Sequence, residues 1–191
     1  SPCGKLSDTI AYDIADYPST VGFGDPEKAV YSEDIYVGYR YFETFAKDRV
    51  LYPFGFGLSY TQFSIDTSEF NVKDNSFTEK VMVKNVGRMS GKEVVQLYVE
   101  APQGKLGKAA RSLCAFAKTK TLSPGESETI DITVPFGRLA SYDDSGITGY
   151  RSASVLEAGT YIIHTGSNVR RTERSGSFSL TKTRIVEQLI E

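Results

Sequence analysis

Between residues 69 and 181 the chain alternates apolar and polar residues in short runs, and this alternation constrains its fold more than any other feature. Successive side chains of a β-strand point to opposite faces, so a period of two marks a strand with one buried face. Turn-forming clusters of Pro, Gly, Ser and Asp separate the runs. About seven runs are present, and no long helical pattern interrupts them. The pattern predicts a mainly β fold, a two-sheet β-sandwich of the fibronectin-like or immunoglobulin-like kind.

Residues 1–66 differ, because they are rich in aromatic side chains but have little regular periodicity. Of the 12 Tyr and 11 Phe in the chain, eight Tyr and six Phe lie before residue 64. Prolines and glycines divide the stretch into turns and extended pieces, and only residues 33–45 have a pattern suited to a short helix or a strand. Each large aromatic side chain removes about 150–250 Å² from water when buried. We therefore expect an irregular, aromatic-rich arm that packs against a neighbouring body.

The two ends of the chain suggest a larger protein. The sequence begins Ser1-Pro2-Cys3-Gly4, with neither an initiator methionine nor a secretory signal, so we expect it to be a piece of something longer. Residues 182–191 form a charged tail. Two interpretations of this tail remain open: a short strand or helix on the surface of the sandwich, or the start of a linker to a further domain.

Charge and composition exclude several classes of function. With 22 Lys and Arg against 24 Asp and Glu, the net charge of −2 gives no electrostatic reason to bind nucleic acid. No stretch approaches the roughly 20 apolar residues of a membrane span. The single histidine and the two distant cysteines, Cys3 and Cys114, do not suit a structural zinc site, and we expect the cysteines to be free. Without a phosphate-binding loop or a nucleophile elbow, we expect no metal and no cofactor.

Three local features contain residue types that occur in catalytic or binding sites. His164 shares a strand face with Ile162, which favours a partly buried residue at a sheet edge over a general base. Asp143 and Asp144 precede Ser-Gly, as in a type I turn whose carboxylate accepts local backbone hydrogen bonds. The basic segment 103–111 is most simply a solvated loop between strands.

The arm also mixes carboxylates with tyrosines, a combination that can bind sugars. Carboxylates accept hydrogen bonds from hydroxyl groups, and aromatic rings cover the apolar faces of sugar rings. The acids concerned are Asp13, Asp16, Asp25, Glu33 and Asp34. A domain-packing arm has the same composition, and we favour packing over sugar binding.

Eight short motifs follow one another along the chain, at residues 2–6, 33–42, 52–61, 83–87, 91–99, 122–126, 139–143 and 159–161. The most specific are Val37-Gly38-Tyr39-Arg40-Tyr41 and Tyr52-Pro53-Phe54-Gly55-Phe56-Gly57-Leu58-Ser59-Tyr60. Together and in this order they resemble the C-terminal portion of glycoside hydrolase family 3, which includes many β-glucosidases and β-xylosidases. The resemblance covers nearly the whole chain, although Cys3 stands where family members usually carry serine.

This resemblance implies a domain organisation. Residues 1–66 would be the tail of an α/β-sandwich domain and a connecting arm, residues 67–181 a fibronectin type III-like β-sandwich, and residues 182–191 a terminal tail or the start of a linker. Because some family members have the domain order reversed, the catalytic barrel could precede or follow this segment.

The resemblance also implies that the parent protein is a retaining β-glucosidase-like enzyme. Retaining hydrolysis needs two carboxyl groups about 5 Å apart. In the family, the nucleophilic aspartate lies in an N-terminal barrel, and the acid/base carboxylate lies in a part of the α/β sandwich that does not match this chain. We therefore assign no catalytic residue, expect no glycoside hydrolysis by the chain alone, and expect its partners to be the remaining catalytic domains.

Two other functions stay open on the sequence. A carbohydrate-binding or adhesion module would need a row of exposed aromatic side chains on the sandwich, and self-association would use the aromatic arm. The near-neutral charge is compatible with the cytoplasm or with export, and the cytoplasm is slightly favoured.

Overall fold

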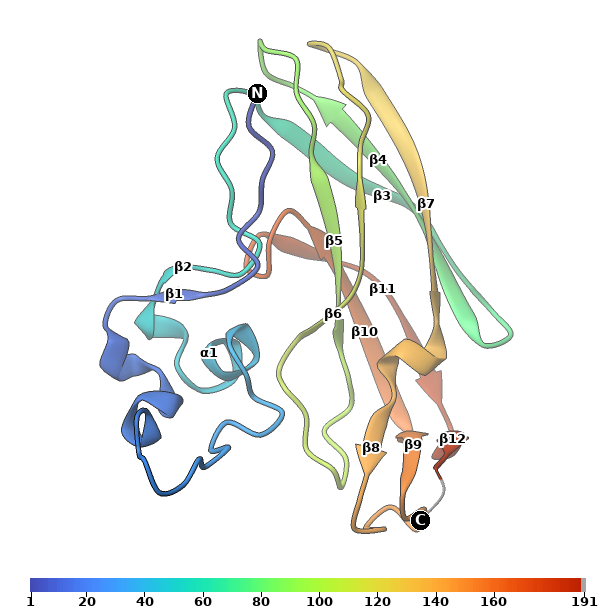
Figure 1. Ribbon diagram of the computed structural model, residues 1–191. Coiled ribbons are helices and arrows are strands. Elements are labelled where there is room, and N and C mark those ends of the chain that lie inside the picture. Colours follow the sequence, from blue (N-terminus) through green and yellow to red (C-terminus); the bar gives the residue numbers. More distant parts are fainter. Residues whose placement is uncertain (190–191) are drawn as a thin grey trace.

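The computed structural model describes residues 1–189, and its main body is a sandwich of two antiparallel sheets (Figure 1). One sheet has the strand order β11-β10-β5-β6, and the other has the order β3-β4-β7. The mainly β sandwich predicted from the alternation is confirmed, and these two sheets hold seven strands. They are β3 (Phe63–Lys73), β4 (Ser76–Asn85), β5 (Val94–Glu100), β6 (Ser112–Lys118), β7 (Ser127–Pro135), β10 (Gly159–Gly166) and β11 (Thr172–Leu180).

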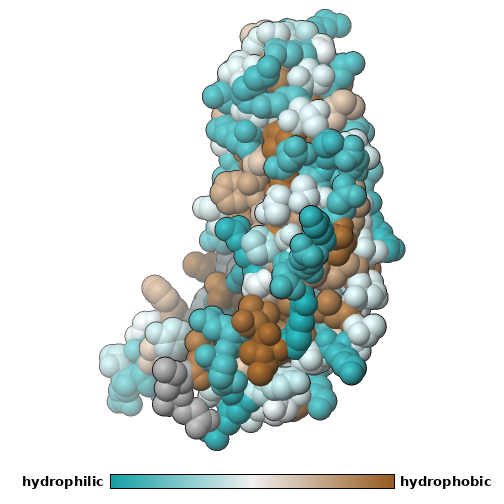
Figure 2. All heavy atoms as spheres, turned by 90° about the vertical axis from the view of Figure 1, so that its right-hand side faces the viewer, coloured by the Kyte–Doolittle hydropathy of each residue, from teal (hydrophilic) through white to brown (hydrophobic). Residues whose placement is uncertain are grey.

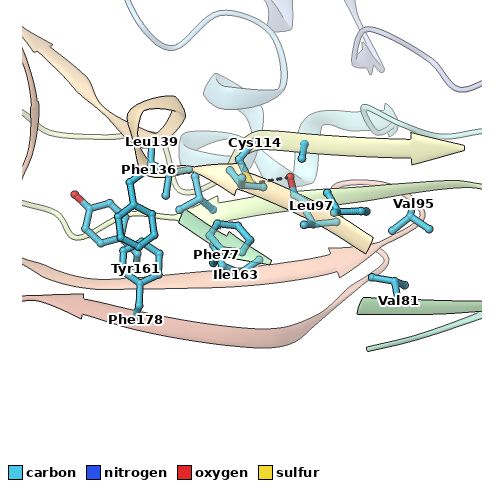
Figure 3. Close-up of a cluster of buried hydrophobic side chains, with 14 of the residues drawn as sticks. Phe77, Val81, Val95, Leu97, Cys114, Phe136, Leu139, Tyr161, Ile163 and Phe178 are labelled. Atoms are coloured by element: carbon cyan, nitrogen blue, oxygen red, sulfur yellow. Dashed lines mark hydrogen bonds between the residues drawn. The ribbon is translucent and has the colours of Figure 1, made fainter. Parts of the chain in front are cut away.

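The core between the two sheets is built from the apolar half of each alternating run (Figure 3). In β4, Phe77, Val81 and Val83 point inward and are fully buried. In β5, Leu97 points inward from the facing sheet, and Cys114 of β6 donates a hydrogen bond from Sγ to the Leu97 carbonyl. Burying each such side chain contributes about 1.5–3 kcal/mol relative to exposure, so the sandwich face of each strand is fixed by its sequence.

Stacked aromatic rings close one end of this core. The ring of Phe178 lies 4.2 Å from that of Phe136 and 5.1 Å from that of Tyr161, centroid to centroid. The Tyr161 hydroxyl donates to the Glu157 carbonyl at 3.0 Å, so the buried phenol keeps a partner. Burial raises the pKa of Tyr161 to about 12.

A third, smaller sheet with the order β12-β9-β8 extends the body at this end. Its strands are β8 (Ser141–Asp143), β9 (Ala153–Leu156) and β12 (Arg184–Gln188), and the short 3-10 helix η4 (Phe136–Leu139) leads into it. The charged tail therefore contains a terminal strand, one of the two interpretations left open, with β12 paired to β9. Residues 190 and 191 of the same tail lie outside the described residues.

The first 60 residues form the predicted irregular arm beside the sheet that contains β5 and β10 (Figure 1). Within residues 33–45 the chain forms a helix, because Gly38, with φ of 60°, turns the chain so that its carbonyl accepts the first helical hydrogen bond. The elements of the arm are β1 (Ile10–Ala11), η1 (Ile14–Asp16), η2 (Pro18–Gly22), α1 (Tyr39–Phe45), η3 (Lys47–Arg49) and β2 (Val50–Tyr52).

The boundary expected between residues 66 and 67 falls inside β3, whose first four residues lie before it. Strand β3 pairs with β4 along its whole length, from Phe63 opposite Asn85 to Lys73 opposite Ser76. The division of the chain into domains stays a prediction, and the regular sandwich starts at Phe63.

The two sheets differ in what covers their outer faces. On the β3-β4-β7 sheet the outward side chains include Lys80, Thr129 and Asp131, and the view from the β7 side shows a largely hydrophilic surface over this part of the molecule (Figure 2). The arm lies on the outer face of the other sheet (Figure 1). The arm therefore covers part of one outer face of the sandwich, where Phe116 of β6 stays exposed.

Candidate interaction surface

Helix α1 and the segment after β2 cover the outer face of the β11-β10-β5-β6 sheet. Tyr98 points away from the sandwich core, yet it is fully buried, because Tyr39 of α1 and Phe54 pack over it. The rings of Tyr39 and Phe54 stack with centroids 4.4 Å apart, and the Tyr39 hydroxyl accepts a hydrogen bond from the Leu113 N–H at 2.8 Å. Burial raises the pKa of Tyr98, whose hydroxyl donates a hydrogen bond to the Gln96 amide oxygen.

Polar contacts fasten the same helix at its other side. The buried carboxylate of Glu43 accepts a hydrogen bond from Arg170 Nε at 2.7 Å, and Arg170 Nη2 also donates to the Lys47 carbonyl at 2.7 Å. The Ala110 N–H donates to Thr44 Oγ1 at 2.9 Å. An ion pair with one buried partner holds its geometry well, because an unpaired charge there is costly. The helix is therefore fixed to two loops of the body.

The two ends of the arm are also joined to each other. Leu6 N donates to the Phe56 carbonyl at 2.7 Å, and Gly55 N donates to the Leu6 carbonyl at 2.8 Å. The N-terminal segment and the segment after β2 approach each other closely at Gly57, where a Cβ atom would lie 2.3 Å from the Gly4 carbonyl oxygen. Lys5 completes the join with an ion pair of 2.7 Å to Glu93 of the body.

The other side of the arm leaves a large apolar area in contact with solvent. Fourteen of the 25 large exposed hydrophobic residues among residues 1–189 precede residue 61. They are Ile10, Tyr12, Ile14, Val21, Phe23, Val30, Tyr31, Ile35, Val37, Phe45, Leu51, Tyr52, Leu58 and Tyr60. Exposed apolar side chains concentrated in one segment in this way are a feature of interaction sites in soluble proteins. This surface is the candidate functional site of the chain.

The carboxylates of the arm do not converge. Asp13 accepts from the Ala15 N–H and caps η1, while Asp16 accepts from the Asp13 N–H and pairs with Arg49 at 3.4 Å. Asp25 accepts from the N–H groups of Glu27 and Lys28. These acids stabilise local turns and caps, which agrees with the packing interpretation over a sugar-binding cluster.

The basic segment 103–111 is a loop between strands β5 and β6, as expected, but it is solvated only in part: residues 103–105 are exposed, whereas Lys108 and Ala109 are buried. The buried carboxylate of Glu157 accepts from Lys105 N at 2.7 Å and forms an ion pair with the buried ammonium of Lys108. Burial alone would raise the pKa of Glu157, but the hydrogen bonds from Lys108 and from backbone N–H groups lower it. These donors stabilise the carboxylate of Glu157, which is only 4% exposed, and they hold the loop against the body.

His164 is partly buried as expected, but it does not lie at a sheet edge. It belongs to β10, which is flanked by β11 and β5, so the edge assignment was wrong. Its Nε2 lies 3.1 Å from Glu100 Oε2, and its Nδ1 lies 3.4 Å from Arg111 Nη2. Burial and the charge of Arg111 lower the pKa of His164.

Asp143 forms the tight turn expected of it. Its carboxylate accepts from the N–H groups of Gly146, Ile147 and Thr148 and from the Thr148 hydroxyl. Although burial opposes it, the donors around the Asp143 carboxylate hold its pKa at about 2. The carboxylate is fully committed to the turn.

Both cysteines are free, as expected, and burial raises the pKa of Cys114 to about 12. In residues 1–189 no group of three or more His, Cys, Asp and Glu side chains is placed to hold a metal ion, and no helix of that range is long and apolar enough to cross a membrane. The expectations of no metal, no cofactor and no membrane partner stay predictions.

Sequence reasoning missed Tyr39, Glu43 and Arg170, which fix the arm, and the pair Lys108–Glu157, which fixes the loop 103–111 to the body. Their partners lie between 49 and 127 residues away along the chain. The only signal available for Glu157 was its position directly after the buried strand β9. A charge at the end of an apolar run often needs a partner, but the sequence does not name that partner.

Comparison with known proteins places this architecture in a class. Residues 93–169 match the model of the fibronectin type III-like domain. A β-glucosidase of Ruminococcus albus is 57% identical over 189 residues, which is 99% of this chain and 20% of that protein. The solved β-glucosidase of Paenibacillus barengoltzii is 54% identical with a TM-score of 0.96, covering all of this chain and 22% of that one. For β-glucosidase 3B of Thermotoga neapolitana, solved with glucose, the identity is 39%, the TM-score 0.87, and the shares covered 97% and 26%.

The chain is thus a fibronectin type III-like sandwich with an N-terminal arm. More particularly, it matches the C-terminal region of glycoside hydrolase family 3 β-glucosidases. It spans about a fifth to a quarter of the length of the curated relatives it matches. The domain match at residues 93–169 is shorter than the sandwich, since β3, β4 and β11 lie outside it.

Proposed function

We propose that this chain is a non-catalytic part of a retaining β-glucosidase-type enzyme, and that it stabilises the catalytic domains of that enzyme. In this proposal residues 1–66 complete an α/β-sandwich domain and connect it to the body, residues 67–181 are the supporting sandwich, and residues 182–191 are a tail or the start of a linker. The partners are the remaining domains of the same protein.

The observation that carries the proposal is the match of the whole chain to a small share of much longer β-glucosidases. The carboxylates add support, because retaining hydrolysis needs two that are free to reach substrate. Among residues 1–189 the buried acids are Glu43, Glu79, Asp143 and Glu157, and each is held by donors of the chain itself. None of these four is available to attack or protonate a glycoside.

The proposal is tested by assaying the chain and its full-length parent side by side with a chromogenic β-glucoside. We expect turnover by the full-length protein and none above buffer by the 191-residue chain. Two full-length variants, Glu43→Gln and Glu157→Gln, serve as controls for a hidden catalytic role. Turnover by the isolated chain that is lost when the same substitution is made in that chain would contradict the proposal.

A carbohydrate-binding module is the competing function, and it needs several exposed aromatic rings in one row. The exposed sandwich aromatics are instead spread over separate elements, with Phe116 on β6, Tyr142 on β8 and Tyr150 in the turn before β9. We therefore rank this function second. Titration with cello-oligosaccharides would reverse the ranking if the isolated chain bound them at millimolar concentration or tighter.

A further inference from the structure

We propose that residues 18–35, here called the docking loop, are the element through which the chain binds the remaining domains of its parent enzyme. The surface that receives the loop is apolar with a basic rim. This inference rests on the proposed function and adds to it the place of contact and the chemistry of the partner surface.

The first argument is the exposure of the loop's largest side chains. Val21 is 96% exposed, Phe23 90% and Tyr31 93%, whereas Tyr39, only eight residues after Tyr31, is 8% exposed. Both tyrosines belong to the same arm, so their difference in exposure comes from the surroundings of each side chain. Tyr39 faces the sheet, and Tyr31 faces solvent. Large, highly exposed aromatic side chains are typical anchors of protein interfaces.

The second argument is that the loop does not use the body for its own structure. The hydrogen bonds of residues 21–35 found within residues 1–189 stay inside the loop or reach its immediate neighbours, as from Glu27 N to Asp25 Oδ1 at 2.9 Å and from Tyr36 N to the Glu33 carbonyl at 2.8 Å. In Figure 1 the loop lies in blue at the outer margin of the arm. Its apolar side chains are therefore free to meet a partner.

The third argument is that both ends of the loop are held. Before the loop, the Tyr17 hydroxyl accepts from Ala11 N and donates to the Thr9 carbonyl, both at 2.9 Å, and its ring packs against Phe42 of α1. After the loop, Tyr36 packs edge-on against Phe45, with ring centroids 4.9 Å apart. A loop presented from fixed ends loses less conformational entropy on binding than a free tail.

The fourth argument is charge, which selects the partner. The docking loop carries Asp25, Glu27, Glu33 and Asp34 against a single Lys28, a net charge of −3. Two copies of the loop would repel each other, so the charge disfavours a second copy of this chain. A basic rim on the parent's other domains would attract the loop. About four fifths of the length of these relatives lies outside the matched region. The rest of a parent protein of similar length would be large enough to form the surface that receives the loop.

Hydrogen–deuterium exchange tests the inference on the protein as it exists. Amide exchange is compared between the full-length parent protein and the isolated 191-residue chain. We expect peptides covering residues 18–35 to exchange at least about tenfold more slowly in the full-length protein, since binding must be undone before these amides open. Peptides of β6 should exchange at the same rate in both.

A pair of full-length variants provides the matched comparison. Phe23→Ser with Tyr31→Ser removes the two most exposed rings of the loop, and Phe116→Ser removes an exposed ring, 68% accessible, from the edge strand β6. We expect the double variant to return the exchange of residues 18–35 to the rate of the isolated chain, and Phe116→Ser to leave it slow. Circular dichroism of the same substitutions in the isolated chain checks that both fold.

The outcomes separate the two proposals. Slower exchange in the full-length protein confined to β6 or to the turn before β9 would overturn the docking loop and leave the supporting function intact. Equal exchange everywhere would overturn both. Sedimentation of the isolated chain as a dimer that the double variant abolishes would assign the loop to a second copy and also overturn the inference.

Discussion

His164, the single imidazole of the chain, lies between opposing charges. Glu100 faces its Nε2, Arg111 faces its Nδ1, and Arg174 of β11 adds a second positive charge nearby. Burial and Arg111 lower its pKa, and Glu100 only partly offsets them. The folded protein therefore prefers the neutral imidazole more than the unfolded chain does.

The sign of the resulting pH dependence follows from this preference. As the pH falls through about 6.5, the unfolded chain binds a proton first, so the free energy of unfolding should fall between pH 7 and the lower pKa of the folded state. Urea unfolding at pH 7.0, 6.5, 6.0 and 5.5 measures this slope. His164→Gln should flatten it, whereas the exposed control Lys182→Gln should not. Equal slopes in all three proteins would contradict the assignment.

Single residues also mark the limit of what the sequence could predict. The turn at Asp143 was predictable, because a carboxylate before Ser-Gly binds backbone groups only a few residues away. The Lys108–Glu157 pair was not, because the two residues meet only after β5, β6 and β9 have assembled. The Glu43–Arg170 ion pair could not be predicted for the same reason, because its partners are 127 residues apart in the sequence. Contacts between residues close in sequence could be predicted from the sequence, and contacts that form only in the tertiary structure could not.

At the scale of elements, one of the hydrogen bonds that hold α1 on the body can be removed while the aromatic ring that makes it stays in place. Tyr39→Phe leaves the ring stacked on Phe54 but removes the acceptor of the Leu113 N–H. We expect a loss of about 1 kcal/mol in the free energy of unfolding. Urea denaturation followed by circular dichroism measures it.

The control lies on the same helix. Tyr41 is partly buried, and within residues 1–189 it forms ring contacts with Phe42 and Phe45 but no side-chain hydrogen bond. Tyr41→Phe should therefore change stability by less than about 0.5 kcal/mol. If both variants lost the same stability, the Tyr39 hydroxyl would have no specific role in seating the helix.

The strands show why the fold could be predicted from the sequence and why the position at which the arm packs could not. In β5, Val95, Leu97 and Val99 take the core positions that their alternation predicts. The same alternation assigns Gln96 and Tyr98 to the opposite face, but it does not say what covers that face. The arm covers it, and a segment without its own period gives no signal of where it will lie.

At the scale of the whole molecule, the docking loop should be the first site of proteolysis in the isolated chain. Lys28 lies in this exposed loop, and cleavage after it requires local opening that costs little there. Limited trypsin digestion should cut after Lys28 while the sandwich stays intact, as read by mass spectrometry. A first cut within residues 63–180 would contradict this order.

The nicked protein should stay in one piece. Strand β1 lies before the cut and β2 after it, and the two pair through Ala11 and Val50. The packing of the Tyr17 ring against Phe42 and the Leu6–Phe56 hydrogen bond also cross the cut. Size-exclusion chromatography should therefore show one species at the original elution volume until denaturant is added. The full-length parent, in which the loop is docked, should resist the cut.

The join between Leu6 and Phe56 also has a consequence for evolution. Because the arm leaves and rejoins the body at one place, insertions or exchanges between these points need not shift the register of any sandwich strand. We expect the segment between these points to tolerate lengthening, shortening or exchange while the sandwich beneath it keeps its structure. Chimeras that trade residues 18–35 between relatives should fold as readily as either parent, and their compatibility with a given catalytic half would then report how finely the two have co-adapted.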